Sequence, residues 1–324
     1  MRTLTYYYSK IAVQSDLQQE VRDLCSSLDV LFLDICIDDD NLLDLRFKDS
    51  SPVILVGPYR LNFPFTLNEV EVAIKATLDQ DARDPERVEN KNRFQMTKME
   101  RFAYWFSNSY AWFVSLVILL FTAFTLLPPV LAANGMNSVA MIGYKFYSVL
   151  CHQLAFRSYF VEGEQFYYPR ALANIPNVMT YEELTGMSAE DIVYARQFIG
   201  NELAGYKIAL CQRDLAIYLA LGLFGIVFHI SGKRIRGIRW YVWFLIALFP
   251  IALDGVSQLP GLSTGWPDWL PIRESTPLLR TITGVLFGAG TAWYVYPLME
   301  ESIKETRFAL KRKMTIAKKF YKQQ

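Results

Sequence analysis

Apolar residues gather in the middle of this chain, between about residue 103 and residue 299. Four apolar runs with almost no charged side chains stand out there: residues 111–133, 215–230, 241–253 and 278–298. A helix that crosses the ~30 Å hydrocarbon layer of a bilayer needs roughly 20 mainly apolar residues, and the third run is the shortest. Tryptophan and tyrosine flank the runs, as they do at membrane interfaces. We therefore expect an α-helical polytopic membrane protein with four transmembrane helices.

Lysine and arginine predict how these helices are oriented. They are frequent between the second and third runs, at Lys233, Arg234, Arg236 and Arg239, and after the fourth, at Lys304, Arg307, Lys311, Arg312, Lys313, Lys318, Lys319 and Lys322. Basic segments next to membrane helices stay on the cytoplasmic side. With four spans both termini are then cytoplasmic. We expect a multi-pass protein of the plasma (inner) membrane, with residues 134–210 outside.

Residues 1–79 have a different pattern, that of a small α/β domain. A strand at residues 4–8, a helix at 14–28 and a strand at 30–37 precede a short helix at 38–45, a hairpin at 52–62 and a helix at 66–78. Thr66 and Glu69 have the spacing of a capping box. This order of elements resembles the thioredoxin and glutaredoxin fold. The resemblance implies a cis-proline at Pro52.

The N-terminal domain lacks the cysteine pair on which the redox members of that family depend. The family places Cys-x-x-Cys after the first strand, and here this position reads Ser9-Lys10-Ile11-Ala12-Val13. Disulfide exchange requires an attacking thiolate, so we expect the domain to be redox-inactive and to serve in docking. Cys25 and Cys36 fall in the expected helix and second strand, where a buried structural thiol is the expected role.

The remaining segments complete the expected domain organisation. Residues 80–102 form a charged linker that is too polar to bury a core. Residues 103–299 form the membrane domain, with an extracytoplasmic insertion at residues 159–204. Helix signals at Thr180 and Ser188 indicate that the insertion is folded, as a lid or a partner-docking surface. Residues 300–324 are expected to continue the fourth transmembrane helix as a basic cytoplasmic helix along anionic lipids.

The overall charge narrows the set of partners. The chain has 33 lysines and arginines against 32 aspartates and glutamates, a formal net charge of +1 at pH 7. Domains that bind nucleic acid concentrate basic residues, and this chain has no such excess. We therefore expect membrane lipids and a membrane protein complex as partners, and no nucleic acid.

Polar residues beside the apolar runs mark the candidate site. Burying such groups is costly unless they pair or bind something. All of them fall on the outer side of the expected topology, which predicts one shared site. The candidates are Cys151, His152, Gln153, Arg157, Cys211, Arg213, Asp214, Asp254, Gln258, Glu274, Ser275, Thr276 and Arg280.

These residues also carry a resemblance. Cys-His-Gln with a later Arg-Ser, Cys-x-Arg, Asp-Gly-x-x-Gln-Leu, Glu-Ser-Thr and Leu-Arg-x-x-Thr-Gly are similar to motifs of a polytopic membrane protein family, domain of unknown function 2085. The similarity extends over residues of about 140–290. The family has no established activity, so the resemblance implies a site but no chemistry. In two departures, Asp214 replaces an expected second cysteine, and residues 159–204 replace a short turn.

Three roles are open for Cys151, His152 and Cys211. A disulfide between Cys151 and Cys211 is favoured, because the outside is oxidising and these are the only two cysteines there. The alternative is a zinc site of Cys151, His152 and Cys211, completed by Asp214 or Asp254. Catalysis with Cys151 as nucleophile and His152 as base is least favoured, because neighbouring side chains seldom reach each other productively.

The arginines give a separate signal. Arg157, Arg213 and Arg280 have the fork geometry that binds phosphate or carboxylate groups. From the sequence we favour the simpler arrangement, in which they pair with nearby carboxylates and tie helix ends together. Our leading hypothesis is a non-enzymatic integral membrane protein, an accessory or assembly subunit of a larger membrane complex. Its rival is a membrane enzyme, or a protein that binds a lipid, an anion or a metal through the polar cluster.

Overall fold

The computed structural model describes residues 3–10, 15–38, 43, 47–83, 96–259, 267, 269 and 273–323. The chain divides into two compact units. The first comprises Met1–Asn108 and Ile303–Gln324, and the second comprises Ser109–Ser302. The C-terminal tail therefore shares a unit with the N-terminal domain, which the sequence pattern did not indicate.

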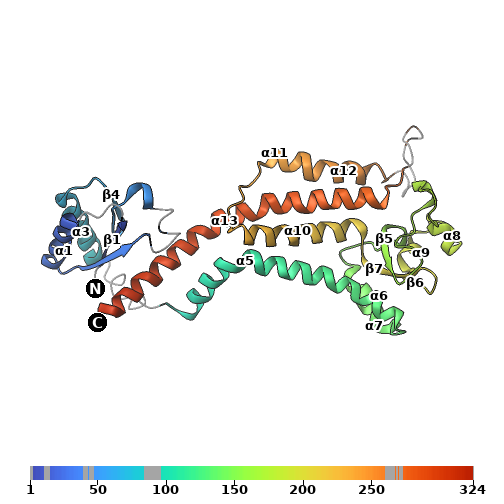
Figure 1. Cartoon of the computed structure of the whole chain (residues 1–324), viewed down its shortest axis with the longest axis horizontal. Coiled ribbons are helices and arrows are strands. Elements are labelled where there is room, and N and C mark those ends of the chain that lie inside the picture. Colours follow the sequence, from blue (N-terminus) through green and yellow to red (C-terminus); the bar gives the residue numbers. More distant parts are fainter. Residues whose placement is uncertain are drawn as a thin grey trace. The chain divides into compact units, whose positions relative to one another are not determined.

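A four-stranded sheet forms the centre of the first unit (Figure 1). Its strands are β1 (Thr3–Tyr8), β2 (Leu31–Cys36), β3 (Val53–Val56) and β4 (Tyr59–Asn62), in the order β2-β1-β3-β4. β1 runs parallel to β2 and antiparallel to β3, which forms a hairpin with β4. The Ser51–Pro52 peptide bond is cis. The strands and the helices Ser15–Ser27 and Leu67–Arg83 follow one another along the chain as predicted, and the cis bond lies at the proline where it was expected.

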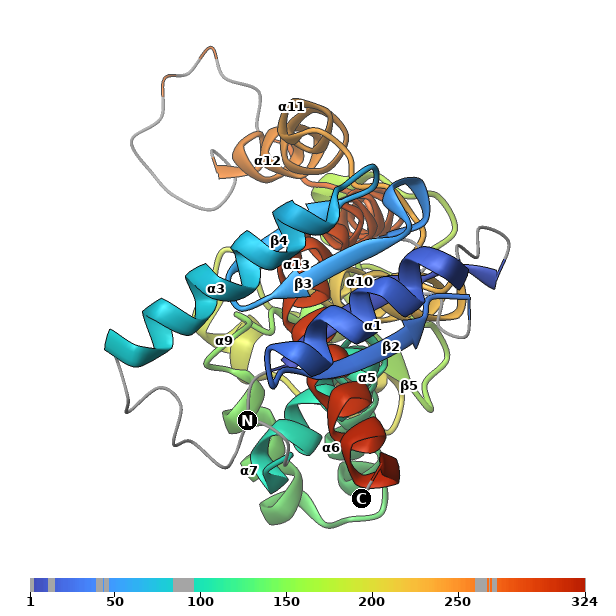
Figure 2. The same cartoon turned by 90° about the vertical axis from the view of Figure 1, so that its left-hand side faces the viewer.

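Two helices, α1 (Ser15–Ser27) and α3 (Leu67–Arg83), cover one face of this sheet (Figure 2). Cys25 of α1 and Ile74 of α3 belong to the apolar core between the helices and the strands. The predicted capping box begins α3. The carboxylate of Glu69 accepts the N–H of Thr66 at 2.8 Å, and Thr66 Oγ1 accepts the N–H of Glu69 at 3.3 Å. Cys25 and Cys36 are free thiols, buried and half-buried respectively.

The opposite face of the sheet is covered by the end of the C-terminal helix, α13 (Pro277–Gln323). Phe308 and Ile316 pack against a buried cluster that includes Tyr7, Phe47 and Val53. The tail was expected only as a basic helix at the membrane, and in the structure it also supplies apolar side chains to this core. Most of the helix predicted over residues 38–45 and most of the predicted linker lie outside the described residues.

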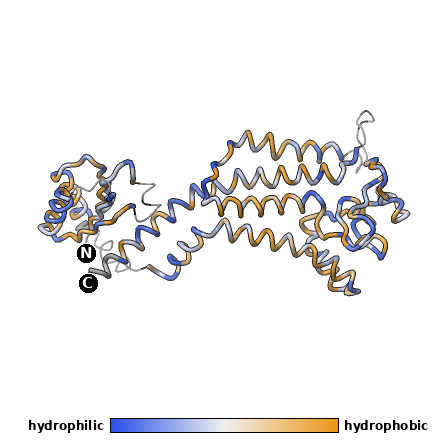
Figure 3. Tube along the Cα trace, viewed as in Figure 1, coloured by the Kyte–Doolittle hydropathy of each residue, from blue (hydrophilic) through white to orange (hydrophobic). Residues whose placement is uncertain are grey.

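The second unit is built of long helices that lie side by side (Figure 1). They are α5 (Lys98–Ala123) with the 3-10 turn Phe124–Leu126 and α6 (Leu127–Ala133), α7 (Asn137–Tyr147), α10 (Gln212–Ile230), α11 (Trp240–Trp243) with the π-helical stretch Phe244–Leu248 and α12 (Phe249–Val256), and the first part of α13. Their traces are mainly hydrophobic (Figure 3). All four apolar runs of the sequence thus fold as helices.

Two of these segments in the described part of the chain, Lys98–Ala133 and Gln212–Ile230, are long and apolar enough to cross a membrane. Only 28% and 22% of their most apolar windows are buried, so most of these side chains do not face a protein core. The third predicted run lies in a shorter apolar helix, Trp240–Val256, and the fourth lies in α13. Length and composition therefore support two of the four expected spans.

Glycines let α13 approach α10 closely, at the spacing Gly284-x-x-x-Gly288. A Cβ atom at Gly284 would lie 2.6 Å from the carbonyl oxygen of Arg213, and one at Gly288 would overlap the carbonyl oxygen of Ile217. Both obstacles are backbone atoms, which cannot rotate away as a flexible side chain does. This contact brings the start of α10 beside the start of α13.

Replacing Gly288 with valine is expected to lower the free energy of unfolding, because overpacking a tight contact costs about 1–3 kcal/mol. Denaturant unfolding of the full chain in detergent measures the change. Val285→Ile, at an exposed position of the same helix, is the matched control and should change stability by less than about 0.5 kcal/mol. Equal effects of the two substitutions would contradict the close contact.

The insertion and the residues on either side of it fold together as a small α/β subdomain at one end of these helices (Figure 1). It contains the antiparallel sheet β5-β7-β6, formed by β5 (Ser158–Val161), β6 (Gly200–Asn201) and β7 (Gly205–Cys211), and the helices α8 (Tyr181–Thr185) and α9 (Ile192–Gln197). Phe156, Phe160 and Tyr181 fill its core. The capping box expected at Thr180 is present. The helix expected from Ser188 is shorter, because the backbone becomes extended at its C-cap before β6 begins.

Candidate functional site

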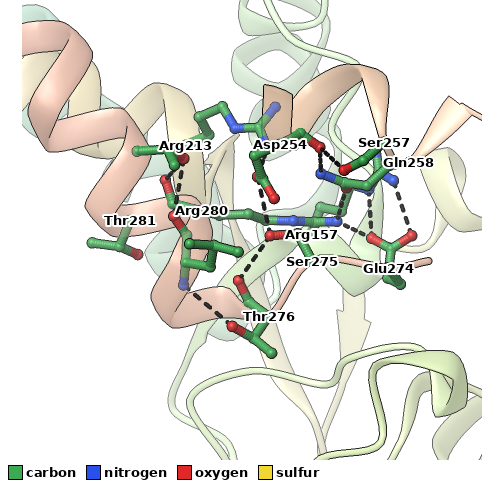
Figure 4. Close-up of polar contacts among 12 residues, drawn as sticks. Arg157, Arg213, Asp254, Ser257, Gln258, Glu274, Ser275, Thr276, Arg280 and Thr281 are labelled. Atoms are coloured by element: carbon green, nitrogen blue, oxygen red, sulfur yellow. Dashed lines mark hydrogen bonds and ion pairs between the residues drawn. The ribbon is translucent and has the colours of Figure 1, made fainter. Parts of the chain in front are cut away.

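Glu274 is the most heavily paired carboxylate of the candidate site (Figure 4). It lies just before α13, and its side chain is 2% exposed. Arg157 meets it with two parallel contacts, Nε to Oε1 at 3.1 Å and Nη2 to Oε2 at 3.0 Å. Arg170 lies 3.4 Å from Oε2, and Arg280 donates to Oε1. One buried carboxylate therefore holds three arginines from three separate parts of the chain.

Asp254, in the last turn of α12, forms a second centre of charge. Its side chain is 4% exposed. Arg213, in the first turn of α10, donates to Oδ2, and Arg273 forms an ion pair with Oδ1 at 3.2 Å. The hydroxyl of Ser275 also donates to Oδ2, at 3.0 Å. These contacts tie the start of α10 and the end of α12 to the segment that precedes α13.

Gln258 connects the two centres, and Thr276 caps the helix that follows Glu274. Gln258 Oε1 accepts a hydrogen bond from Arg280 at 2.8 Å, and its Nε2 donates to the carbonyl oxygen of Asp254 at 2.5 Å. Gln258 thus links Arg280, which is paired with Glu274, to Asp254, which forms the second centre. Thr276 Oγ1 accepts the N–H of Leu279 at 3.2 Å and so caps the first turn of α13.

Cys151 and Cys211 lie next to each other and to Asp214. One ligand atom from each of the three residues lies within 4.8 Å of the other two. Cys211 is the N-cap of α10, and its thiol donates to Asp214 Oδ2 at 3.1 Å. The N–H of Cys211 in turn donates to Cys151 Sγ at 3.3 Å. The neighbouring Cys211 thiol, burial and the charge of Asp214 raise the pKa of Cys151 well above its usual range.

A cavity of about 460 Å³ opens beside these groups. The polar residues of its wall are Arg157, Arg213, Arg280, Cys151, Cys211, His152, Asp214, Gln153 and Gln258. Its apolar wall consists of Leu150, Leu154, Ile192 and Leu259. Asp214 is the one acidic residue of this wall, which contains three arginines.

Arginines outnumber carboxylates in the wall of this cavity, where Arg157, Arg213 and Arg280 stand against Asp214. The arginines at 170 and 273 and the carboxylates at 254 and 274 lie behind this wall, and Glu182 and Glu190 add negative charge near Arg170. Burial lowers the pKa of Arg157 to about 10, so its guanidinium is still charged at neutral pH. Buried charge is costly unless a partner of opposite sign offsets it.

Lys207 is a buried basic residue beside the cavity wall that the sequence did not single out. It lies in β7 and is 0% exposed. Its Nζ donates to the carbonyl oxygens of Gln153 at 2.8 Å and Arg196 at 2.7 Å. The Gln153 amide donates to the carbonyl oxygens of Tyr144 at 2.9 Å and Ala209 at 2.8 Å. These bonds hold the segment that carries Cys151 against β7, and burial lowers the pKa of Lys207 to about 7.

The structure changes two of the roles expected for the cysteines. Cys151 and Cys211 are free thiols, so the expected disulfide is not present, although the structure brings the two residues together. Their sulfurs instead accept and donate hydrogen bonds. His152 is exposed and is not in the group of candidate ligands, where Asp214 takes its place. The reason is that adjacent residues point their side chains in different directions, so Cys151 and His152 do not converge.

Two arginines of the site were not among the candidates from the sequence. Arg170 lies in the insertion, 104 positions from Glu274, and no motif marks it. Arg273 directly precedes Glu274, and its place beside the Glu-Ser-Thr motif is the signal that could have found it. The candidates from the sequence, His152 included, lie in the charged cluster, the cysteine group or the cavity wall, except for Thr276, which caps α13.

Comparisons with known proteins relate part of this chain to membrane proteins. Residues 196–294 match a family model described as a predicted membrane protein (DUF2085). This stretch is narrower than the range expected from the motifs, and it contains Cys211, Asp254 and Glu274. The uncharacterized protein MJ1492 of Methanocaldococcus jannaschii is 27% identical over 175 residues, which cover 53% of this chain and 77% of that protein. No solved structure matches.

These comparisons describe the matched stretch as that of a predicted membrane protein, and they assign it no activity. The thioredoxin-like assignment of residues 1–79 rests on the strand order and on the cis peptide at Pro52, and it stays a prediction. The role as an accessory or assembly subunit stays a prediction as well.

Proposed function

We propose that this chain is a multi-pass protein of the plasma (inner) membrane whose arginine-lined cavity binds a phosphate-bearing anion. The anion is the headgroup of an anionic lipid or a small soluble phosphate compound. The sequence leaves a membrane enzyme, or a protein that binds a lipid, an anion or a metal, as the alternative to an accessory subunit. The arginines of the cavity wall favour anion binding among these.

The observation that carries the proposal is the group of three arginines in the cavity wall, which contains one carboxylate. These arginines are Arg157, Arg213 and Arg280, and the carboxylate is that of Asp214. Guanidinium groups bind phosphate oxygens through parallel hydrogen bonds. Arg280 is 3% exposed, and an anion in the cavity would offset the charge of the three guanidinium groups.

The size and lining of the cavity fit the same class of ligand. A volume of about 460 Å³ is typical of sites for small organic molecules and exceeds the volume of one phosphate group. The leucines and the isoleucine of its wall suit the carbon part of an organic phosphate or a lipid. The N-termini of α10 and α13 also lie at the site, and the positive end of a helix dipole attracts anions.

Four transmembrane helices are the membrane arrangement that we propose. Large apolar side chains are exposed on the helices of the third and fourth runs as well as on the two longer segments: examples are Leu245, Phe249, Leu253, Leu278, Ile282 and Val285. Exposing such faces to water is unfavourable, and lipid would cover them. The basic residues at 233–239 and 304–322 favour cytoplasmic termini.

For the first unit we propose a thioredoxin-like docking domain without thiol chemistry. The order β2-β1-β3-β4 and the cis bond before Pro52 support the fold. The lack of a Cys-x-x-Cys at residues 9–13 of the sequence supports the lack of redox activity. A docking domain on one side of the membrane and an anion site on the other are both compatible with the role of a subunit in a membrane complex.

Inorganic phosphate should bind the purified full chain in detergent, as measured by isothermal titration calorimetry. Arg213→Gln is expected to weaken this binding about tenfold or more, because a hydrogen bond to a charged group contributes about 1.5–3 kcal/mol. Arg213 is the right position because Asp254 keeps Arg273 as a partner. Arg196→Gln, an exposed arginine outside the cavity wall, is the control and should leave the affinity unchanged.

Two sources of the phosphate group are separated by a second titration with phosphatidylcholine vesicles that contain or lack phosphatidic acid. Tighter binding of the anionic vesicles than of inorganic phosphate, lost in Arg213→Gln, assigns the site to a lipid headgroup. The reverse order assigns it to a soluble phosphate compound. Binding of neither probe, or equal losses in Arg213→Gln and Arg196→Gln, would contradict an arginine-lined anion site.

The proposed topology predicts where an impermeant maleimide reacts in intact cells. Glu190 is exposed in the insertion, and Arg234 is exposed in the basic loop after α10. Glu190→Cys should be labelled above the background of the unsubstituted chain, whereas Arg234→Cys should be labelled only after the membrane is permeabilised. The opposite pattern would invert the topology, and labelling of both in intact cells would remove the membrane barrier between them.

A further inference from the structure

We propose that Cys151, Cys211 and Asp214 form a binding site for one zinc-class divalent cation in the wall of the cavity, with the fourth coordination position open to the cavity. The site goes beyond the anion site and does not depend on it, because the arginines and the cysteine group are separate parts of the same wall. No contact in the structure requires both to be occupied.

The geometry of the three ligand atoms is close to that of a tetrahedral site. They lie within 4.8 Å of one another, and Cys211 Sγ and Asp214 Oδ2 are 3.1 Å apart. With zinc–sulfur bonds of about 2.3 Å and tetrahedral angles, two sulfurs on one zinc are separated by about 3.8 Å. Side-chain rotations that move the ligand atoms by about 1 Å therefore suffice to place all three atoms around one ion.

The backbone around the two sulfurs is arranged to support thiolates. Cys151 Sγ receives the N–H groups of Cys211 at 3.3 Å and Gln153 at 3.5 Å, and Cys211 Sγ receives the N–H of Asp214 at 3.5 Å. Metal-bound thiolates are generally held by such surrounding hydrogen bonds. Cys211 also stands at the N-terminus of the 19-residue helix α10, where a thiolate is favoured.

Helix capping alone does not account for this group. Cys211 as N-cap and Asp214 in the first turn would begin α10 without help from Cys151. Cys151 comes from a different element, after α7 and 60 positions earlier, and it is 5% exposed in the cavity wall. The convergence of a second sulfur on the cap is what a shared ligand explains.

The chemistry of the ligands selects the ion. Two sulfurs and one carboxylate suit Zn²⁺ and similar borderline cations, whereas Mg²⁺ and Ca²⁺ prefer oxygen ligands. Binding would release the thiol protons, and two thiolates with one carboxylate around Zn²⁺ carry a net charge of −1. Arg157 and Arg213 of the same wall lie where they can balance that charge. Three protein ligands leave one position for water or for a solute in the cavity.

The test uses the full chain purified in detergent under reducing conditions, loaded with Zn²⁺ or Co²⁺ and then freed of excess metal. We expect about one zinc per chain, and with Co²⁺ the near-ultraviolet absorption of a thiolate–cobalt bond. Cys211→Ser should lose both signals. Asp214→Asn should weaken binding at least tenfold, since even a lost outer-shell partner of a metal ligand costs about 10–100-fold.

Two further variants keep the result interpretable. Asp214→Cys supplies a stronger ligand at the same position and should retain the metal. If it does, the weaker binding of Asp214→Asn comes from the lost ligand and not from a loss of folding. Cys36→Ser, in the first unit, is the control and should bind as the unsubstituted chain does. Failure of the unsubstituted chain to bind Zn²⁺ or Co²⁺ would overturn the proposal, as would a Cys151–Cys211 linked peptide in the protein isolated from its membrane. Phosphate binding that persists without metal leaves the anion site standing.

Discussion

Replacing Glu274 with glutamine is expected to lower the free energy of unfolding by about 3–5 kcal/mol, the cost of removing one partner from a buried ion pair. Three arginines share this carboxylate: Arg157, Arg170 and Arg280. The glutamine side chain has nearly the same shape, so the change removes charge and leaves little cavity. The three guanidinium groups would then remain buried beside one another without the carboxylate that separates their charges.

Denaturant unfolding of the full chain in detergent measures this change. Glu164→Gln is the matched control, because Glu164 is an exposed glutamate of the insertion. It should alter the free energy of unfolding by less than about 0.5 kcal/mol. A loss of under 1 kcal/mol in Glu274→Gln would mean that Glu274 does not hold the cluster together.

Stability is expected to rise as the pH increases from 7 to 8.5, by up to about 1.4 kcal/mol per pH unit, and Lys207 is the reason. Burial lowers the pKa of Lys207 from 10.5 to about 7. Above pH 7 the folded chain has released this proton while the unfolded chain still holds it, so added protons favour unfolding. Two other residues affect the pKa of Lys207 through their charges: Cys151 raises it, and Arg196 lowers it.

Lys207→Met isolates this effect, because methionine is neutral at every pH. The measurement is the difference in unfolding free energy between the two chains at pH 7 and at pH 8.5, in metal-free buffer. Lys145→Met, at an exposed position of α7, should not change the slope. If Lys207→Met keeps the slope of the unsubstituted chain, Lys207 is not the group that releases its proton on folding.

Local patterns predicted much of the fold. The Thr66 and Thr180 caps are visible as short motifs, because a capping box depends on residues three positions apart. The apolar runs predicted helices because the apolar pattern of a helix lies within one continuous stretch of sequence. The end of α13 is different. The sequence predicts Phe308 and Ile316 only as part of a basic tail, because the sheet that they cover is formed by residues far away in the chain.

The site was predicted to the extent that its residues lie beside apolar helices. Arg213, Asp254 and Arg280 stand out because a charged residue in or directly beside an apolar run is unusual. Arg170 stands in a polar insertion, where an arginine is ordinary, and only the fold of that insertion brings it to Glu274. The same topology argument put Cys151 and Cys211 on one side, yet it could not specify whether a bond, a metal or hydrogen bonds would join them.

The central claim is that the cavity holds a phosphate-bearing anion against its arginines. Native mass spectrometry of the full chain, extracted from its own membrane in mild detergent, tests this most directly. We predict a bound species that contains phosphorus, retained in Arg196→Gln and depleted in Arg213→Gln. A chain that carries no such species, or one that keeps it equally in both variants, would contradict the claim.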